Sequence, residues 1–266
     1  MYVYFLDKLA QEQPGKFSIP VFESEIVQHD IRGRIERLST FKDPTIIIED
    51  AIAAGQATTI IAVGEDATFF ELLPFAIKHK LGIGFIPLQK QSRLSHIFGM
   101  PHGLAAVQLL AKRLTQTLDV LTIVSAEETH QSIFGITLPT SARVFIEDSW
   151  SVRVKDDSGA TLCIENAATM ETLSEKNPHI NAFNDGLLDV VTKKTTTSMK
   201  RWFGSAESST LDHFQARSVR VESASATMNA VGDNDARIAL PCTITVTPKA
   251  LHCIVGKESV LLSNPQ

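Results

Sequence analysis

The chain has 266 residues, of which 44% are hydrophobic and 21% charged, and its formal net charge is −5. These values are typical of a globular chain with one large domain or two of moderate size. The negative charge argues against a general nucleic-acid binder. No sequence stretch approaches the roughly 20 apolar residues of a membrane-spanning helix. The three cysteines lack metal-ligand spacing, so we expect reduced thiols and a cytoplasmic location.

Predicted strands alternate with predicted helices over the first 120 residues. Asp43 can cap a helix over Pro44–Ala54, and Gly55 can end it. We expect loops at 7–20 and at Gln89–His96, and one unassigned strand or helix within Val21–Leu38. The remaining predicted elements are strands at Tyr2–Leu6, Ile60–Val63 and Leu81–Leu88, and helices from Phe69 to about Lys80 and at Gly103–Leu114. This alternation predicts a parallel α/β sheet.

Beyond Asp119 the pattern changes to short β-rich runs that are separated by turns. The runs are Val120–Val124, Ile133–Leu138, Arg143–Ile146, Ser151–Val154, Thr161–Ile164, Leu187–Thr192, Ser218–Val221, Ile244–Thr247 and Leu251–Val255. Asp, Ser, Gly or Pro bound many of them, which is typical of antiparallel strands. We therefore expect an α/β domain at 1–120 and an antiparallel β-sandwich domain at 121–266.

The turn after the Ile60–Val63 strand is the first candidate site. Gly64 ends the strand, and the next helix begins close behind it, so Glu65, Asp66 and Thr68 lie in the turn and the first helical turn. Unpaired backbone N–H groups at such a joint bind phosphorylated ligands in open α/β sheets. In the alternative interpretation Asp66 or Thr68 simply caps the helix, because either side chain can satisfy the same donors.

Three further segments combine charged residues with turn or aromatic residues. Asp185–Val190 and Asp233–Asp235 each contain residues that accept the left-handed backbone of a turn. The run Lys200, Arg201, Trp202 and Phe203 joins cations to aromatics, as membrane-interface segments do. A packed short helix with a charged face is the alternative for this run.

In their order and spacing these segments resemble motifs of the diacylglycerol kinase catalytic-domain family, the bacterial diacylglycerol and sphingosine kinase-like lipid kinases. The resemblance covers about residues 58–256. Val63–Thr68 stands where the family has Gly-Gly-Asp-Gly-Thr, and Glu71 matches the acid after that loop. Asp185–Val190 is close to the family's Asp-Gly-x-Leu-Asp-Val, and Asp233–Asp235 falls at its Asp-Gly-Glu. Shorter matches are Ile86–Leu88, Phe98–Pro101, Leu118–Val120 and Asn166.

The resemblance implies an α/β nucleotide domain, a β-sandwich domain, and ATP-dependent phosphorylation of a lipid hydroxyl. It implies Asp66 and Asp233 as catalytic residues, Asp233 being the general base, and a structural Mg²⁺ at Asp185 and the Leu187 carbonyl. The implied nucleotide-binding residues are Gly64, Glu65, Asp66, Ala67, Thr68, Glu71, Lys90 and Arg93. The expected partners are the nucleotide and a lipid substrate, with peripheral membrane contact through Lys200–Phe203. A homodimer is left open.

Departures from the family pattern keep two alternatives open. Glu65 and Ala67 replace loop glycines, and Glu65 adds negative charge where an anion should bind. Gln89–Arg93 lacks the glycines of the family's second nucleotide loop, although Lys90 and Arg93 can still meet phosphates as cations. Ala182 stands where a further metal-ligating acid is expected. The chain can therefore be a catalytically inactive homologue that binds a nucleotide, a lipid or a partner. It can also be a soluble-substrate kinase, because NAD kinases share the Gly-Gly-Asp-Gly-Thr loop.

Overall fold

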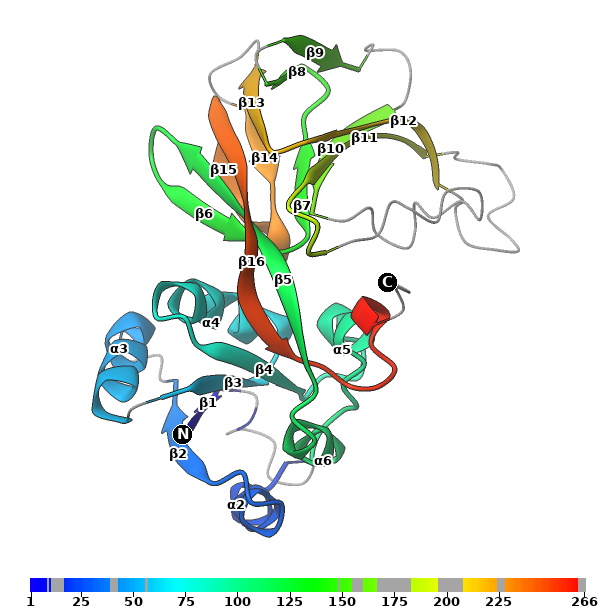
Figure 1. The fold of residues 1–266 in the computed structure, drawn as a ribbon. Helices are drawn as coiled ribbons and strands as arrows, with labels where there is room; N and C mark the ends of the chain where they lie inside the picture. The colour runs from blue at the N-terminus through cyan, green and yellow to red at the C-terminus, as the bar shows by residue number, and fades with distance from the viewer. Residues whose placement is uncertain are drawn as a thin grey trace. The chain divides into compact units, whose positions relative to one another are not determined.

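The computed structural model describes residues 1–8, 10, 17–38, 43–55, 57–147, 149–154, 160–166, 183–195, 208–223 and 228–262. The chain divides into two compact units (Figure 1). The first unit comprises Met1–Thr117 and Ala250–Gln266, and the second comprises Leu118–Lys249. The chain leaves the first unit along β5 (Thr115–Ser125) and returns to it along β16 (Cys242–Ile254).

The first unit is built on a parallel sheet. Its strands are β1 (Tyr2–Leu6), β2 (Gly33–Arg37), β3 (Thr59–Gly64) and β4 (Gly82–Pro87), in the order β2-β1-β3-β4, and the end of β16 pairs with β4. The helices are α2 (Ile19–Gln28), α3 (Pro44–Gly55), α4 (Asp66–Lys78), α5 (Arg93–Phe98) and α6 (Ala105–Ala111), followed by a short η3 (Val260–Leu262). β1, β3 and β4 are almost wholly buried, which explains their continuous apolar sequences.

Helices cover both faces of this sheet (Figure 1). Neighbouring residues of β4 point to opposite faces because strand side chains alternate. Phe85 lies against Phe69 of α4, with ring centroids 6.0 Å apart. A Cβ on Gly84 would instead lie 3.0 Å from Leu110 of α6. The missing side chain at Gly84 therefore lets α6 pack closely on the face opposite α4.

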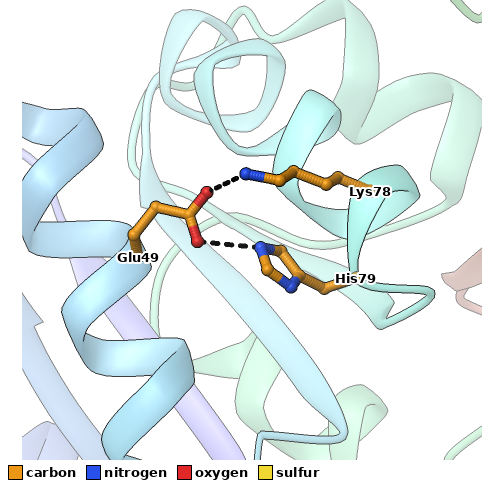
Figure 2. A network of polar contacts seen from close by, with 3 residues as sticks. All are labelled: Glu49, Lys78 and His79. Atoms are coloured by element: carbon orange, nitrogen blue, oxygen red, sulfur yellow. Dashed lines mark hydrogen bonds and ion pairs between the residues drawn. The ribbon is translucent and has the colours of Figure 1, made fainter.

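A polar network joins α3 to the end of α4 (Figure 2). Glu49 Oε1 accepts a hydrogen bond from Lys78 Nζ at 2.5 Å, and Glu49 Oε2 lies 2.8 Å from His79 Nε2. These contacts, the hydrogen bond from Lys78 first, lower the pKa of the Glu49 carboxyl. The network therefore holds the exposed edges of two neighbouring helices together.

The second unit is antiparallel in all its described pairings. A six-stranded sheet has the order β12-β11-β10-β7-β14-β15, and β8, β9, β13 and the beginning of β16 form further pairs, as do β5 and β6. Apolar residues from these strands pack into one core cluster. The remaining bounds are β6 (Thr129–Ser132), β7 (Gly135–Leu138), β8 (Ala142–Ile146), β9 (Trp150–Arg153), β10 (Ala160–Glu165), β11 (Leu188–Thr195), β12 (Ser208–Ala216), β13 (Ser218–Ser223), β14 (Asn229–Val231), η2 (Asp233–Asp235) and β15 (Arg237–Ala239).

The predicted fold class is confirmed: a parallel α/β unit is combined with an antiparallel β unit. The expected boundary near residue 120 lies close to the observed division after Thr117. The C-terminal segment differs from the expectation, because residues 250–266 belong to the first unit. The reason is that His252 and Cys253 of β16 pair with β4.

Several element predictions need correction. The expected loop at Gln89–His96 contains the start of α5, because Ser92 Oγ accepts a hydrogen bond from Ser95 N and caps a helix there. α2 begins at Ile19, inside the other expected loop, and Val21–Leu38 holds both this helix and β2. The two predicted strands at Ile244–Thr247 and Leu251–Val255 form one long strand, β16. Strands β6, β12, β14 and β15 were not predicted.

Within the described ranges, no helix combines the length and the apolar character needed to cross a membrane. Cys163, Cys242 and Cys253 are buried free thiols.

Candidate functional site

The turn after β3 requires a glycine. Gly64 has φ +157°, and a Cβ placed on it would lie only 1.7 Å from Asp7 Oδ2. Glu65 follows in an extended conformation, and Asp66 begins α4. The structure therefore brings the predicted residues Gly64, Glu65, Asp66, Ala67 and Thr68 together in one strand-to-helix turn.

The carboxylate of Asp7, the residue directly after β1, lies in this turn. Asp7 Oδ2 accepts hydrogen bonds from Glu65 N at 2.8 Å and from Thr68 Oγ1 at 2.9 Å. Asp7 Oδ1 accepts a further bond from Ala10 N at 3.0 Å, and Asp7 N donates to Val63 O at 3.1 Å. Asp7 comes directly after β1, which lies beside β3 in the sheet. Its carboxylate is therefore held over the start of α4 by both backbone and side-chain donors.

The contacts of Asp7 bear directly on nucleotide binding. The Glu65 N–H and the Thr68 hydroxyl are the kinds of donor that a phosphate oxygen needs at a helix N-terminus. Here both donate to a carboxylate that already carries negative charge. A nucleotide phosphate could therefore bind these two donors only by displacing the Asp7 carboxylate. Asp7 was not among the predicted site residues, although its place directly after a strand of the same parallel sheet was a usable signal.

Asp66 is also engaged within the chain. Its Oδ1 accepts a hydrogen bond from Ser92 Oγ at 2.5 Å, and its Oδ2 accepts from Arg93 N at 3.0 Å and Leu94 N at 3.3 Å. The first residue of α4 thus satisfies backbone donors at the start of α5. Glu65 bonds to Gln89 through their side chains. Asp66 therefore acts as a cap, but it caps α5 and not α4, the helix that the sequence predicted.

The other predicted nucleotide residues surround this turn. Desolvation raises the pKa of the Glu71 carboxyl, and the negative charges of Asp43 and Asp7 raise it further. Lys90 is exposed between β4 and α5, and the exposed Arg93 is the first residue of α5. Asp7 and Asp43 therefore both add negative charge near Glu71.

In the second unit, Asp119 anchors the Asp185–Leu187 turn. Asp119 is fully buried, and its carboxylate accepts hydrogen bonds from Gly186 N and Lys249 N, each at 2.6 Å. Gly186 has φ +77°, a conformation that favours glycine. Asp185 Oδ1 accepts a bond from Leu187 N at 2.9 Å. Sequence reasoning placed Asp119 in a matching motif but did not predict this contact.

The same turn was predicted to hold Mg²⁺. Desolvation raises the pKa of the Asp185 carboxyl, and the charge of Asp119 raises it further. A carboxylate in such a negative field suits a cation that takes oxygen ligands and retains several waters. The Mg²⁺ site at Asp185 and the Leu187 carbonyl therefore stays a prediction. Among the described residues, no group of three His, Cys, Asp or Glu side chains forms a fuller cage.

Asp233 is fixed by the β6–β7 connection. Its Oδ2 accepts hydrogen bonds from Ser132 Oγ at 2.9 Å, Ile133 N at 2.8 Å and Phe134 N at 3.2 Å. Asn234 and Asp235 both have left-handed backbones, with φ of +53° and +57°. The left-handed turn predicted for this segment is therefore present. The hydrogen bonds from Ser132, Ile133 and Phe134 hold the partly exposed Asp233 side chain in one orientation.

Asn166 connects the surroundings of the two acidic turns. Its side chain is fully buried, and Nδ2 donates to Asp119 O at 2.7 Å and to Ile133 O at 3.1 Å. Asp119 holds the Asp185 turn, and Ile133 donates to Asp233. The sequence match at Asn166 therefore corresponds to a bridge between the two segments within the second unit.

A further acid of the Asp185–Val190 motif lies on β11. The buried Asp189 Oδ1 is 2.6 Å from His213 Nε2 and accepts from Gln215 Nε2 at 3.2 Å. Burial raises the pKa of Asp189, and the contacts with His213 and Gln215 oppose that shift. Sequence reasoning missed His213 because β12, which carries it, was not predicted. The run Lys200, Arg201, Trp202 and Phe203, like Ala182, lies outside the described residues.

Comparisons with known proteins were made on sequence and on structure. No protein-family model matches the chain, and no curated protein matches it in sequence. Solved structures match it over almost the whole length. A diacylglycerol kinase from Bacillus anthracis str. Sterne has a TM-score of 0.66 and 16% sequence identity, covering 97% of this chain and 98% of that one.

Two further structures from the same organism are each described as a "putative diacylglycerol kinase". One has a TM-score of 0.70 at 15% identity, covering 97% of this chain and 98% of its own. The other has a TM-score of 0.68 at 16% identity, with 97% of each chain covered. At such identities the likeness establishes the fold, which is the fold that the order of the sequence motifs predicted. The chain thus has the diacylglycerol kinase-like fold, with its parallel α/β part and its antiparallel β part.

Proposed function

We propose that the chain is a lipid-kinase-like phosphotransferase that transfers a phosphoryl group from ATP·Mg²⁺ to a lipid hydroxyl of the diacylglycerol type. The observation that carries the proposal is the fold, which matches that of diacylglycerol kinases over 97% of the chain and at least 97% of theirs. Both parts of the kinase fold are therefore present in the chain.

In this proposal Asp233 takes the proton of the attacking hydroxyl. Its Oδ2 is oriented by Ser132, Ile133 and Phe134, so the carboxylate is held in place before a substrate arrives. General-base catalysis by a positioned side chain contributes roughly 10²- to 10⁴-fold to a rate. Asp185 and the Leu187 carbonyl would hold the structural Mg²⁺, which would neutralise the negative field around that turn.

A second candidate is favoured by the contacts of Asp7 and Asp66. The Asp7 carboxylate already accepts hydrogen bonds from the Glu65 N–H and the Thr68 hydroxyl, and Asp66 caps α5. A phosphate at Gly64–Thr68 would have to displace the first of these carboxylates and approach the second. The alternative function is therefore a catalytically inactive kinase homologue that binds a lipid or a partner.

Nucleotide titration and a lipid kinase assay distinguish the two candidates. The purified chain is titrated with ATP·Mg²⁺ by calorimetry and incubated with labelled ATP and diacylglycerol in mixed micelles. Saturable binding and labelled phosphatidic acid support the kinase. Absence of binding at millimolar nucleotide rejects the kinase in favour of the inactive homologue. The same assay with NAD in place of diacylglycerol tests the alternative that the chain is a soluble-substrate kinase.

A further inference from the structure

A cavity of about 440 Å³ lies at the amino-terminal ends of the parallel strands in the first unit. Tyr2, Thr59 and Gly82, the first residues of β1, β3 and β4, line it together with Ile254 at the end of β16. Gly64 is at the opposite end of β3, so this cavity is separate from the predicted phosphate loop. Its volume falls within the range of small-molecule sites.

Cationic and hydroxyl side chains dominate the polar lining. The lining contains two arginines, Arg32 and Arg113, and one acid, Asp30, so these three side chains carry a net positive charge within a chain whose formal net charge is −5. His252 and the hydroxyls of Thr58, Thr59 and Thr115 complete the set. Guanidinium groups bind phosphate through paired N–H donors, and threonine hydroxyls can donate to the remaining oxygens.

The guanidinium of Arg113 is held at the cavity wall by two neighbours, the Tyr2 ring and the Asp30 carbonyl. Arg113 has φ +53° two residues after the end of α6, and its N–H donates to Leu110 O. Helices commonly end in this conformation with glycine, because a side chain makes it costly. Arg113 nevertheless carries a guanidinium, which lies 5.9 Å from the centroid of the Tyr2 ring and 3.5 Å from Asp30 O. The ring and the carbonyl thus orient the cation at the cavity wall.

Asp30 has the same left-handed backbone conformation as Arg113. It has φ +54° after α2, again at a helix end where glycine is favoured, and it lines the same cavity. The ends of α2 and α6 therefore each place a charged residue at the same cavity. We propose that the cavity binds a phosphate group, either free or as a monoester, through Arg32, Arg113 and the hydroxyls of Thr59 and Thr115.

The first test uses inorganic phosphate as the probe and Arg113→Gly as the variant. Glycine keeps the left-handed backbone and removes the cation, so the fold should survive while phosphate affinity falls at least tenfold. Lys80→Gly is the matched control, because Lys80 has φ +52° after α4 and does not line the cavity. Its phosphate affinity should stay within twofold of wild type. Arg32→Ala, at an exposed residue, provides a second variant that should also weaken binding.

A second arm identifies the source of the phosphate group. The wild-type chain is floated with vesicles of phosphatidylcholine alone or with added phosphatidic acid. Flotation that requires phosphatidic acid and is lost in Arg113→Gly assigns the site to a lipid headgroup, and calorimetric binding of inorganic phosphate assigns it to the free anion. The proposal is overturned if wild type responds to neither probe, or if both arginine variants bind as wild type does. None of these outcomes depends on phosphoryl transfer, so the kinase proposal stands or fails separately.

Discussion

Thr68 Oγ1 donates a hydrogen bond to Asp7 Oδ2 over 2.9 Å, although the two residues are 61 positions apart in the sequence. The same Asp7 oxygen accepts from Glu65 N, so a carboxylate of the chain stands at the N-terminus of α4. Negative charge is favourable at that end of a helix. The chain therefore supplies its own anion where the sequence predicts the phosphate of a nucleotide.

We expect Asp7→Asn to bind ATP·Mg²⁺ more tightly than wild type. The substitution removes one negative charge from the turn but leaves an amide oxygen that can still accept a hydrogen bond. We expect a gain of about 1.4 kcal/mol in binding free energy, on the order of tenfold in affinity. This is less than the full repulsion of about 4 kcal/mol between two unit charges about 4 Å apart at an effective dielectric of about 20. Isothermal titration of both proteins measures the difference.

The matched control for this prediction is Asp43→Asn. Asp43 also contributes negative charge near Glu71, but it caps α3 by accepting from Thr45 N and does not contact the Gly64–Thr68 turn through a described hydrogen bond. Its effect on nucleotide affinity should be clearly smaller. Equal gains in nucleotide affinity from both variants would show that the total negative charge near the turn determines the affinity and that the contact of Asp7 with the turn does not.

Gly64→Ala should destabilise the first unit. The added Cβ would lie 1.7 Å from Asp7 Oδ2, so the strand end or the Asp7 side chain must move. We expect a loss of about 2–3 kcal/mol in the free energy of unfolding, measured by denaturant titration. Gly103→Ala is the control, because Gly103 has φ +69° with nothing within 4 Å of the added Cβ. It should cost only the backbone term, about 1 kcal/mol. A Gly64→Ala protein as stable as this control would contradict the close approach.

Much of the fold was predictable because its signals are local. β1, β3 and β4 are continuous apolar runs, which parallel strands buried on both faces require. α3 begins and ends where Asp43, Pro44 and Gly55 predict. The order of the Gly64, Asp185 and Asp233 segments was sufficient to indicate the kinase-like fold.

The contacts that define the site were not predictable in the same way, because they depend on tertiary register. The place of Asp7 after a predicted strand puts it at the same edge of the sheet as Gly64, but the contact also requires that β1 and β3 are neighbours, and the spacing of the sequence does not give the strand order. Asp119 contacts Gly186 and Lys249 from far along the chain. α5 is six residues long and is capped partly by Asp66 of another helix, so its own sequence is read as a loop.

Asp185→Asn should make the protein more stable near neutral pH in the absence of divalent cations. Desolvation and Asp119 raise the pKa of Asp185 above 3.8 in the folded state, so the folded chain binds this proton more tightly than the unfolded chain does. The stability of wild type therefore falls as pH rises from about 4 through the raised folded pKa. The variant lacks this contribution, and its melting temperature should decline less over that window. An identical pH dependence in both proteins would contradict the raised pKa.

The same pair of proteins tests the Mg²⁺ assignment. A cation at Asp185 and the Leu187 carbonyl would favour the ionised carboxylate and stabilise the folded state by mass action. Millimolar Mg²⁺ should then raise the melting temperature of wild type and leave that of Asp185→Asn unchanged, with EDTA reversing the effect. Equal responses of the two proteins to Mg²⁺ would remove this turn from the list of metal sites.

Asp233→Asn tests the proposed general base. The amide oxygen can still accept from Ile133 N and Phe134 N, so the turn and the melting temperature should change little. If the chain phosphorylates diacylglycerol, the loss of the base should lower the rate by roughly 10²- to 10⁴-fold. Ser132→Ala is the control, since it removes one donor to Asp233 and the acceptor of Gly135 N but keeps the carboxylate itself. Its rate should fall far less than that of Asp233→Asn. Full activity in Asp233→Asn, alongside an unchanged fold, would assign the proton transfer to another group.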